Sequence, residues 1–230
     1  MRLLKIFCRQ IMKSQINLIL SLRRQGLDPN AILVWLALRK ALLGCNSVLD
    51  VGCGVSGKLR ELGVPNTTGF EGYLPDFEKA KRLNTHDHLV QGDAHELSRH
   101  FQPLQFDAVI ALDVIEHFTK DGGLKLMQDM EKVARKKVIF LTPNGFLPQR
   151  QSAEGDLQAH LSGWDPAEMK RFGYEAIGQL GPKILRGEGH VLKHRPAAFW
   201  GVMSLIGQIA WSQYHPNQAT AILCVKDLSR

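Results

Sequence analysis

The chain has 230 residues, of which 44% are hydrophobic and 22% charged, a composition typical of a globular domain with a full core. Its four cysteines are scattered and form no C-x-x-C pair, which excludes a disulfide framework and argues against a zinc site. The formal net charge of +7 favours contact with anionic partners.

The first 27 residues are basic, and no acid precedes Asp28. Apolar residues recur there at helical spacing, which predicts a basic amphipathic helix. Its cations are spread throughout and no small-residue cleavage site follows, so it does not read as a signal peptide. We expect this helix either to pack on the domain or to contact a membrane surface or polyanion. The predicted organisation is a helical extension over residues 1–44 and an α/β domain over 45–230.

Residues 31–43 read as a helix that leads into a strand at 47–51. The segment Val48–Gly57 reads V-L-D-V-G-C-G-V-S-G, which is typical of a strand, a tight loop and a helix, here 57–62. We expect Gly52 to permit a sharp turn and Gly54 to leave room for a ligand against the main chain. We expect Gly57 to permit close packing of the strand and helix.

Three further strands are each followed or closed by an acid. The second covers 67–71 and ends at Glu71, the third ends at Asp93, and the fourth covers 107–112 and is followed by Asp113. A short helix is predicted over 76–83, with Asp76 as its N-cap. A longer helix is predicted over 120–135 from apolar residues that recur every three positions.

The second half is less regular. A fifth strand is predicted over 137–142, and the polar loop 143–163 has the length of a functional lid. Asp165 is expected to cap a helix that ends at Gly173. Two more strands follow, at 174–179 and 219–225, and the uncharged stretch 197–211 is too short to span a bilayer. This alternation predicts a Rossmann-like, doubly wound, mostly parallel seven-stranded sheet with helices on both faces.

Four segments together resemble the class I S-adenosylmethionine-dependent methyltransferases, especially the broad small-molecule type. They are Val48–Gly54, Phe70-Glu71, Gly92-Asp93-Ala94 and Ala111–His117. The resemblance implies S-adenosyl-L-methionine as the cofactor, with Asp50 beside its amino acid end, Glu71 on the ribose hydroxyls and Asp93 on the adenine amino group. The full set of cofactor-binding residues that it implies is Asp50, Gly52, Cys53, Gly54, Glu71, Gly72, Asp93, Ala94, Leu112 and Asp113.

Methyl transfer depends mainly on alignment and on exclusion of water, but an oxygen acceptor must lose a proton. Two histidines are candidates for the base: His117, just after the fourth strand, and His160 in the expected lid. The others between 86 and 100 show no metal-like spacing and are expected to be solvated; they are His86, His88, His95 and His100. No metal site is predicted.

The sequence thus predicts a cytoplasmic enzyme, with peripheral membrane association as an alternative, that methylates a small or lipid-like acceptor at oxygen. Methylation of RNA or another macromolecule is the first alternative, since the chain is basic and nucleic acid is not excluded. An NAD(P)-dependent oxidoreductase is the second, because the glycine pattern and the ribose-binding acid are common to both. A cofactor-binding protein without turnover is the third.

Overall fold

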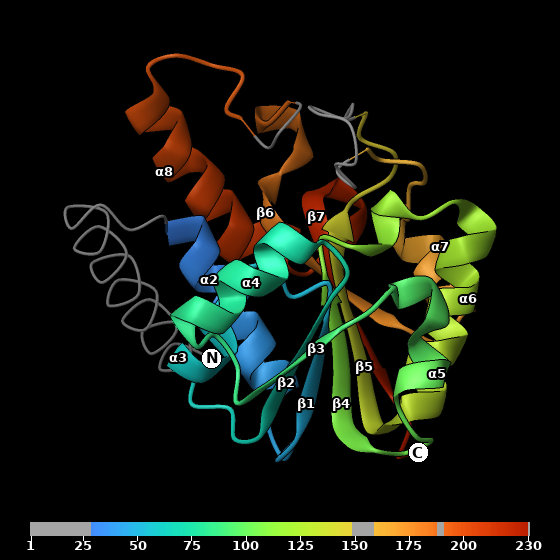
Figure 1. Cartoon of the computed structure of the whole chain (residues 1–230). Helices are drawn as coiled ribbons and strands as arrows, with labels where there is room; N and C mark the ends of the chain where they lie inside the picture. The colour runs from blue at the N-terminus through green and yellow to red at the C-terminus, as the bar shows by residue number, and fades with distance from the viewer. Residues whose placement is uncertain (1–28, 149–158, 188–190, 230) are drawn as a thin grey trace, which may run out of the picture.

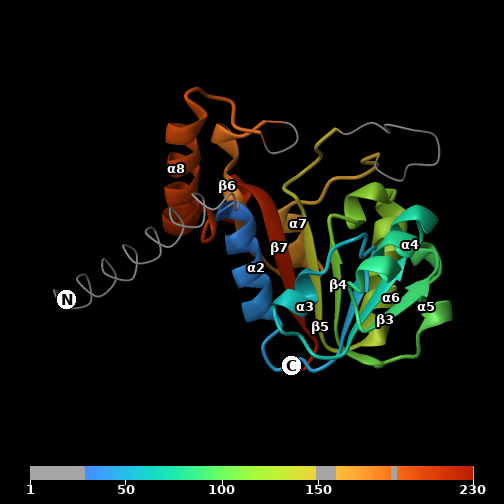
Figure 2. The same cartoon turned by 60° about the vertical axis from the view of Figure 1, so that its left-hand side comes forward.

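A computed structural model describes residues 29–148, 159–187 and 191–229 (Figure 1). The basic helix expected at the N-terminus lies outside the described residues, and so does the middle of the expected lid loop. The described part is an α/β fold with one central sheet (Figures 1 and 2).

Seven strands form the sheet in the order β3-β2-β1-β4-β5-β7-β6. β1 to β5 pair in parallel, whereas β7 runs antiparallel between β5 and β6. The strands are β1 Val48–Val51, β2 Thr67–Glu71, β3 His88–Gln91, β4 Phe106–Leu112, β5 Ala134–Pro143, β6 Glu175–Pro182 and β7 Ala219–Asp227. The order reverses between β1 and β4, which is where an open α/β sheet binds ligands beyond its carboxyl ends.

Helices cover both faces of the sheet, as the sequence predicts (Figures 1 and 2). The α-helices are α2 Pro29–Ala41, α3 Lys58–Glu61, α4 Leu74–Leu83, α5 Leu97–His100, α6 Lys120–Val133, α7 Pro166–Arg171 and α8 Ala197–Gly207. α2 and α3 lie on one face, and α5, α6 and α7 lie on the other. α2 packs on β6 and β7, so this helix belongs to the covering layer, and where the N-terminal extension ends stays a prediction.

Alternation along the strands divides the core into two apolar clusters. Val109 and Phe140 face the helices α5, α6 and α7, whereas their neighbours Ile110 and Ile139 face α2 and α3. All four side chains are fully buried. Strands that are apolar on both faces are typical of a parallel sheet covered on both sides.

The helix ends show which capping signals the sequence carries correctly. Asp165 accepts a hydrogen bond from the backbone N–H of Glu168 at 2.9 Å, and Gly173 follows α7 at φ +87°, both as expected. The expected cap at Asp76 is wrong. α4 begins earlier, with Tyr73 as its N-cap and no side-chain cap, because Pro75 fits the first turn and leaves Asp76 inside it.

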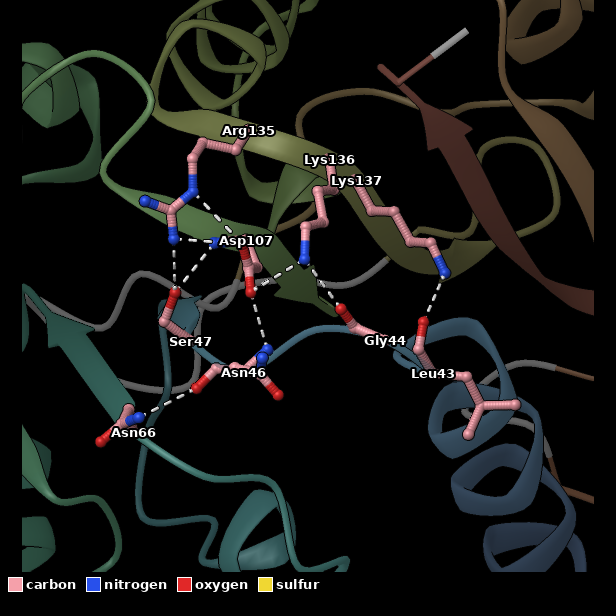
Figure 3. A network of polar contacts seen from close by, with 9 residues as sticks. All are labelled: Leu43, Gly44, Asn46, Ser47, Asn66, Asp107, Arg135, Lys136 and Lys137. Atoms are coloured by element: carbon pink, nitrogen blue, oxygen red, sulfur yellow. Dashed lines mark hydrogen bonds and ion pairs between the residues drawn. The ribbon is translucent and has the colours of Figure 1, made fainter.

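A polar network closes the end of the sheet opposite the carboxyl ends of the parallel strands (Figure 3). The buried carboxylate of Asp107 accepts from the backbone N–H of Asn46 at 2.8 Å, and it pairs with Arg135 at 3.1 Å and Lys136 at 3.3 Å. Burial alone would raise the pKa of Asp107, but the hydrogen bonds from Asn46, Lys136 and Arg135 outweigh it and the pKa is lowered. The network joins the start of β4 to the starts of β1 and β5.

α8 is an apolar helix of 11 residues that continues into a π-helical turn, Gln208–Ser212. Its apolar length matches the uncharged stretch expected at 197–211. Across the described ranges, no helix has the length and apolar character needed to cross a membrane.

Candidate functional site

The glycine loop after β1 turns back over the end of β2. Gly52 has φ +65°, and a Cβ there would lie 2.6 Å from Cγ2 of Val114, so this position requires glycine. Gly54 has φ +53°, and a Cβ there would meet nothing within 4 Å, so its surroundings leave space for a ligand. Gly57 was expected to permit close packing of strand and helix, and this expectation is wrong. A Cβ added there would lie 3.9 Å from the nearest atom, an ordinary van der Waals distance.

The carboxylate of Glu71 holds this loop in place. One oxygen accepts the backbone N–H of Gly54 and the other accepts that of Tyr73, each at 2.8 Å. The backbone N–H groups of Gly52 and Cys53 both donate to the carbonyl of Phe70. Glu71 therefore joins two segments of backbone, and each of its oxygens retains a lone pair that can accept from a ligand hydroxyl.

Asp50 lies buried at the carboxyl end of β1, where the sequence places it. Its partner is His86, whose Nε2 lies 3.2 Å from Oδ2 of Asp50 and whose Nδ1 lies 3.0 Å from the hydroxyl of Thr85. His86 is 5% exposed, so the expectation of a solvated histidine is wrong. Burial raises the pKa of Asp50, and the contact with His86 offsets only part of this effect.

The ends of β2 and β3 lie side by side. A Cβ on Gly72 would lie 3.3 Å from the carbonyl oxygen of Gly92, so the two backbones approach closely. Asp93 is exposed and accepts from the backbone N–H of His95 at 2.9 Å, which starts a short 3₁₀ helix at Ala94. His95 is also close to Asp93 through its Nδ1, at 2.8 Å. Asp93 thus keeps an oxygen available at the expected adenine end.

The turn after β4 gathers two acids next to the glycine loop. β4 ends at Leu112, and Asp113 follows with φ +55° and donates its backbone N–H to the carbonyl of Leu141 at 2.8 Å. Glu116 is 2% exposed, and its carboxyl accepts from the hydroxyl of Thr142 at 3.1 Å. Burial, strengthened by the charge of Asp113, raises the pKa of Glu116 to about 8.

The structure brings the two candidate bases together. The ring centroids of His117 and His160 lie 4.9 Å apart. Nδ1 of His117 lies 3.1 Å from the carbonyl oxygen of Ala159, and Nδ1 of His160 lies 2.6 Å from that of Leu147. The carbonyls of Ala159 and Leu147 thus each orient one of the two imidazoles.

The described part of the lid is anchored by a lysine that sequence reasoning missed. Nζ of Lys120 lies 3.5 Å from the centre of the Trp164 ring, and it donates to Gly163 O and to a carboxylate oxygen of Glu168, each at 2.6 Å. Trp164 is fully buried, which makes it an anchor of the segment. One signal for Lys120 was available: a cation in the first turn of a helix opposes the helix dipole, so it needs a partner.

These groups fit an adenosyl amino acid. The space beside Gly54, the acids at the ends of β1 and β2, and the exposed Asp93 at the end of β3 supply room and acceptors along one edge of the sheet. That edge is where the ligands of doubly wound folds bind. The individual roles of the ten cofactor residues stay predictions.

Comparison with known proteins agrees with this arrangement. Residues 49–147 match the family model described as a methyltransferase domain. A small RNA 2'-O-methyltransferase of Tetrahymena thermophila is 26% identical over 146 residues, a match that covers 51% of this chain and 34% of that protein. The chain thus spans about a third of the length of this curated relative.

Solved structures share the fold. A SAM-dependent methyltransferase from Archaeoglobus fulgidus aligns with a TM-score of 0.55 and 14% identity, over 85% of this chain and 93% of that one. The methyltransferase domain of a bacterial protein, CtHen1-C, aligns with a TM-score of 0.52 and 17% identity, over 84% and 95%. The methyltransferase domain matched over residues 49–147 and the seven-stranded sheet shared with SAM-dependent methyltransferase structures together support a class I S-adenosylmethionine-dependent methyltransferase family.

Proposed function

We propose that this enzyme methylates a hydroxyl oxygen of a lipid-like or other small apolar acceptor. One observation carries the proposal: the paired imidazoles of His117 and His160 lie beside exposed apolar side chains of the lid. Phe146 is 60% exposed and Leu161 is 57% exposed. Leu161 donates its backbone N–H to the carbonyl of Glu116, so this apolar rim adjoins the turn after β4.

When bound, the cofactor supplies an electrophilic methyl carbon, to which the acceptor oxygen bonds while the electron pair of the S–C bond stays on sulfur. The chain has to position the acceptor and provide for its proton. Since Nδ1 of each imidazole faces a carbonyl, Nε2 is the atom with a lone pair for a proton. The apolar rim favours a dry contact with the acceptor, which aids alignment.

A second group of apolar side chains supports a lipid-like acceptor. α8 exposes Phe199, Met203 and Ile206, by 55%, 39% and 40%. Both views of the molecule place α8 at the same end of the sheet as the described residues that follow β5 (Figures 1 and 2). Exposed apolar surface of this kind is typical of sites for apolar ligands or membranes. Contact of residues 1–27 with an anionic membrane stays a prediction.

The second candidate acceptor is the 2'-hydroxyl of RNA. The name of the Tetrahymena relative favours it, as that protein is a small RNA 2'-O-methyltransferase. The net charge of +7 is also compatible with a polyanion. The lipid-like acceptor and RNA are both methylated at a hydroxyl oxygen. They differ in the surface of the enzyme that would bind them.

The test is methyl transfer from S-adenosylmethionine labelled in its methyl group. The panel holds a long-chain lipid with a free hydroxyl, the same lipid already O-methylated, a short single-stranded RNA, and that RNA with 2'-deoxy sugars. Label in the free hydroxyl lipid alone supports the first proposal. Label in the RNA but not in its deoxy partner selects the second. Label in neither, from protein that binds S-adenosylhomocysteine, would refute both.

A further inference from the structure

α8 and its π-helical continuation turn apolar side chains outward. These side chains recur at helical spacing, with one extra residue in the π-helical turn, so they share one face of the helix. This outer face comprises Phe199, Met203, Ile206, Trp211 and Tyr214. A surface helix of a globular domain usually has the opposite arrangement, with its apolar side chains toward the core.

The face of the same helix that points to the sheet is mostly polar. Its buried side chains are Ser204, Leu205, Gln208 and Ser212. The amide of Gln208 donates to the carbonyl of Gly178 and accepts from the backbone N–H of Gly181, both at 2.7 Å. A Cβ on either glycine would collide with Ser212 or Ser204, so helix and strand approach closely. These contacts fix the rotation of the helix, and the apolar outer face is held away from the core.

Charge along this part of the chain is sorted. The connection between β6 and α8, residues 183–195, carries one acid, Glu188, and the cations Lys183, Arg186, Lys193 and Arg195. From 196 to 218 no Asp, Glu, Lys or Arg follows. Nε of Arg186 donates to Oγ of Ser204 at 3.1 Å, which holds this basic connection against α8. A basic segment beside an apolar helix face matches an anionic membrane, whose phosphates lie above its acyl chains.

The residue types of the outer face also favour a membrane. Trp and Tyr are enriched where a bilayer meets water, because each joins an apolar ring to a polar atom. Trp211 and Tyr214 form one end of the outer face. α8 has 11 residues and is therefore about 16 Å long, whereas the hydrocarbon core of a bilayer is about 30 Å thick. The helix has the length to lie in the interface and not to cross it.

We propose that the outer face of α8 and the basic connection before it dock the enzyme on an anionic membrane. Phe199, Met203 and Ile206 then lie against the acyl chains, and the exposed side chains of Lys193 and Arg195 contact the lipid phosphates. The outer face is covered by lipid in this arrangement, which accounts for its apolar character.

The basic connection also contacts the turn after β5. Nζ of Lys183 donates to the carbonyl of Asn144 at 2.6 Å, and Phe146, two residues further on, is exposed. Both views place α8 at the same end of the sheet as this turn (Figures 1 and 2). A docked bilayer therefore lies at the end of the molecule where the acceptor is expected. That the bilayer delivers the acceptor rests on the proposed function.

The test is co-sedimentation of the full chain with vesicles, without cofactor or acceptor. One set of vesicles is phosphatidylcholine alone, and the other also contains phosphatidylglycerol as its anionic lipid. We expect binding to the anionic set, and weaker binding to the neutral set and at high salt. Phe199→Ser and Met203→Ser should each weaken binding to the anionic set by roughly three- to tenfold, since each removes apolar area from the contact. Lys193→Gln should weaken it by roughly fivefold and leave binding to the neutral set unchanged.

Leu43→Ser is the matched control. Leu43 is also an exposed apolar residue, but it lies beside the polar network at the opposite end of the sheet (Figure 3). Its replacement should leave vesicle binding at the wild-type level. Binding of S-adenosylhomocysteine verifies that each variant is folded.

Absence of vesicle binding by the wild type would overturn the docking surface, and so would equal binding by the wild type and both α8 serine variants. A homodimer that Phe199→Ser dissociates, seen by analytical ultracentrifugation in the absence of vesicle binding, would also overturn it and assign the outer face to a second copy of the chain. Vesicle binding that both α8 serine variants lose would support the surface even where no acceptor of the panel is labelled, so its outcome is separate from that of the proposed function.

Discussion

Replacing Glu71 by glutamine is the most direct perturbation of the cofactor half of the site. The change keeps the side-chain shape but puts an NH₂ group where one oxygen now accepts the N–H of Gly54 or Tyr73. The new NH₂ group then faces a backbone N–H, so one hydrogen bond is lost. The other hydrogen bond is made to a neutral amide oxygen in place of a carboxylate. Hydrogen bonds to charged groups contribute about 1.5–3 kcal/mol, so we expect a total deficit of about that size.

The deficit divides between the free protein and the bound state. If the whole free energy is lost from the hydrogen bonds to the ribose hydroxyls, binding of S-adenosylhomocysteine should weaken by roughly 10- to 150-fold. Free energy lost from the hydrogen bonds to Gly54 and Tyr73 should destabilise the free protein and lower its melting temperature by about 2–4 °C for each kcal/mol.

The assay is calorimetric titration with S-adenosylhomocysteine, paired with urea unfolding. Asp107→Asn is the matched control, since it removes an acid from the opposite end of the same sheet (Figure 3). It should lower stability and leave ligand affinity within a factor of about two. Wild-type affinity in Glu71→Gln would refute the placement of the ribose, and an equal loss of affinity in both variants would show a general loss of folding.

Three further outcomes test other parts of the structure. Gly52→Ala should lower the free energy of unfolding, measured in urea, by about 1–3 kcal/mol. The reason is that residue 52 has a positive φ and that an added Cβ would lie 2.6 Å from a methyl group of Val114. Gly57→Ala is the control and should leave the free energy of unfolding nearly unchanged. Asp107→Asn should lower the free energy of unfolding by about 1–2 kcal/mol at pH 7. The pKa of Asp107 is lowered in the folded state, so its carboxyl stabilises the fold only where it is ionised. The difference in stability between variant and wild type should therefore shrink as the pH falls below about 4. Lys120→Met should raise the KM for the acceptor and leave the affinity for S-adenosylhomocysteine unchanged, since Lys120 anchors the lid; a parallel loss of ligand affinity would contradict that role.

Local patterns were sufficient for the parallel half of the sheet. β2 begins and ends at the residues predicted, and Glu71 is the acid that closes it. β5 begins three residues before the predicted start at 137. Its first residues are charged and resemble the end of a helix, but the side chain of Arg135 pairs with Asp107, so the strand can begin with polar residues.

The positions of the expected cofactor residues were predictable for the same reason, whereas the meeting of the expected acceptor residues was not. Asp50, Gly52 and Glu71 each lie at the end of a strand, and a parallel sheet gathers such ends by topology alone. The meeting of Glu116 with His160 depends on how the chain returns after β5, which has no local signal. The burial of His86 against Asp50 was missed for a similar reason, because it joins the start of β3 to the end of β1.

Glu116, buried just beyond the carboxyl end of β4, indicates where this fold gives up stability for function. A buried carboxyl is costly unless a cation or several donors compensate it. Asp107, at the other end, has two cations and a backbone N–H, and it serves the fold. Glu116 is as deeply buried, but the side-chain bond described for it comes from the neutral hydroxyl of Thr142. The carboxyl of Glu116 is therefore compensated less well than that of Asp107, and burial raises the pKa of Glu116 to about 8.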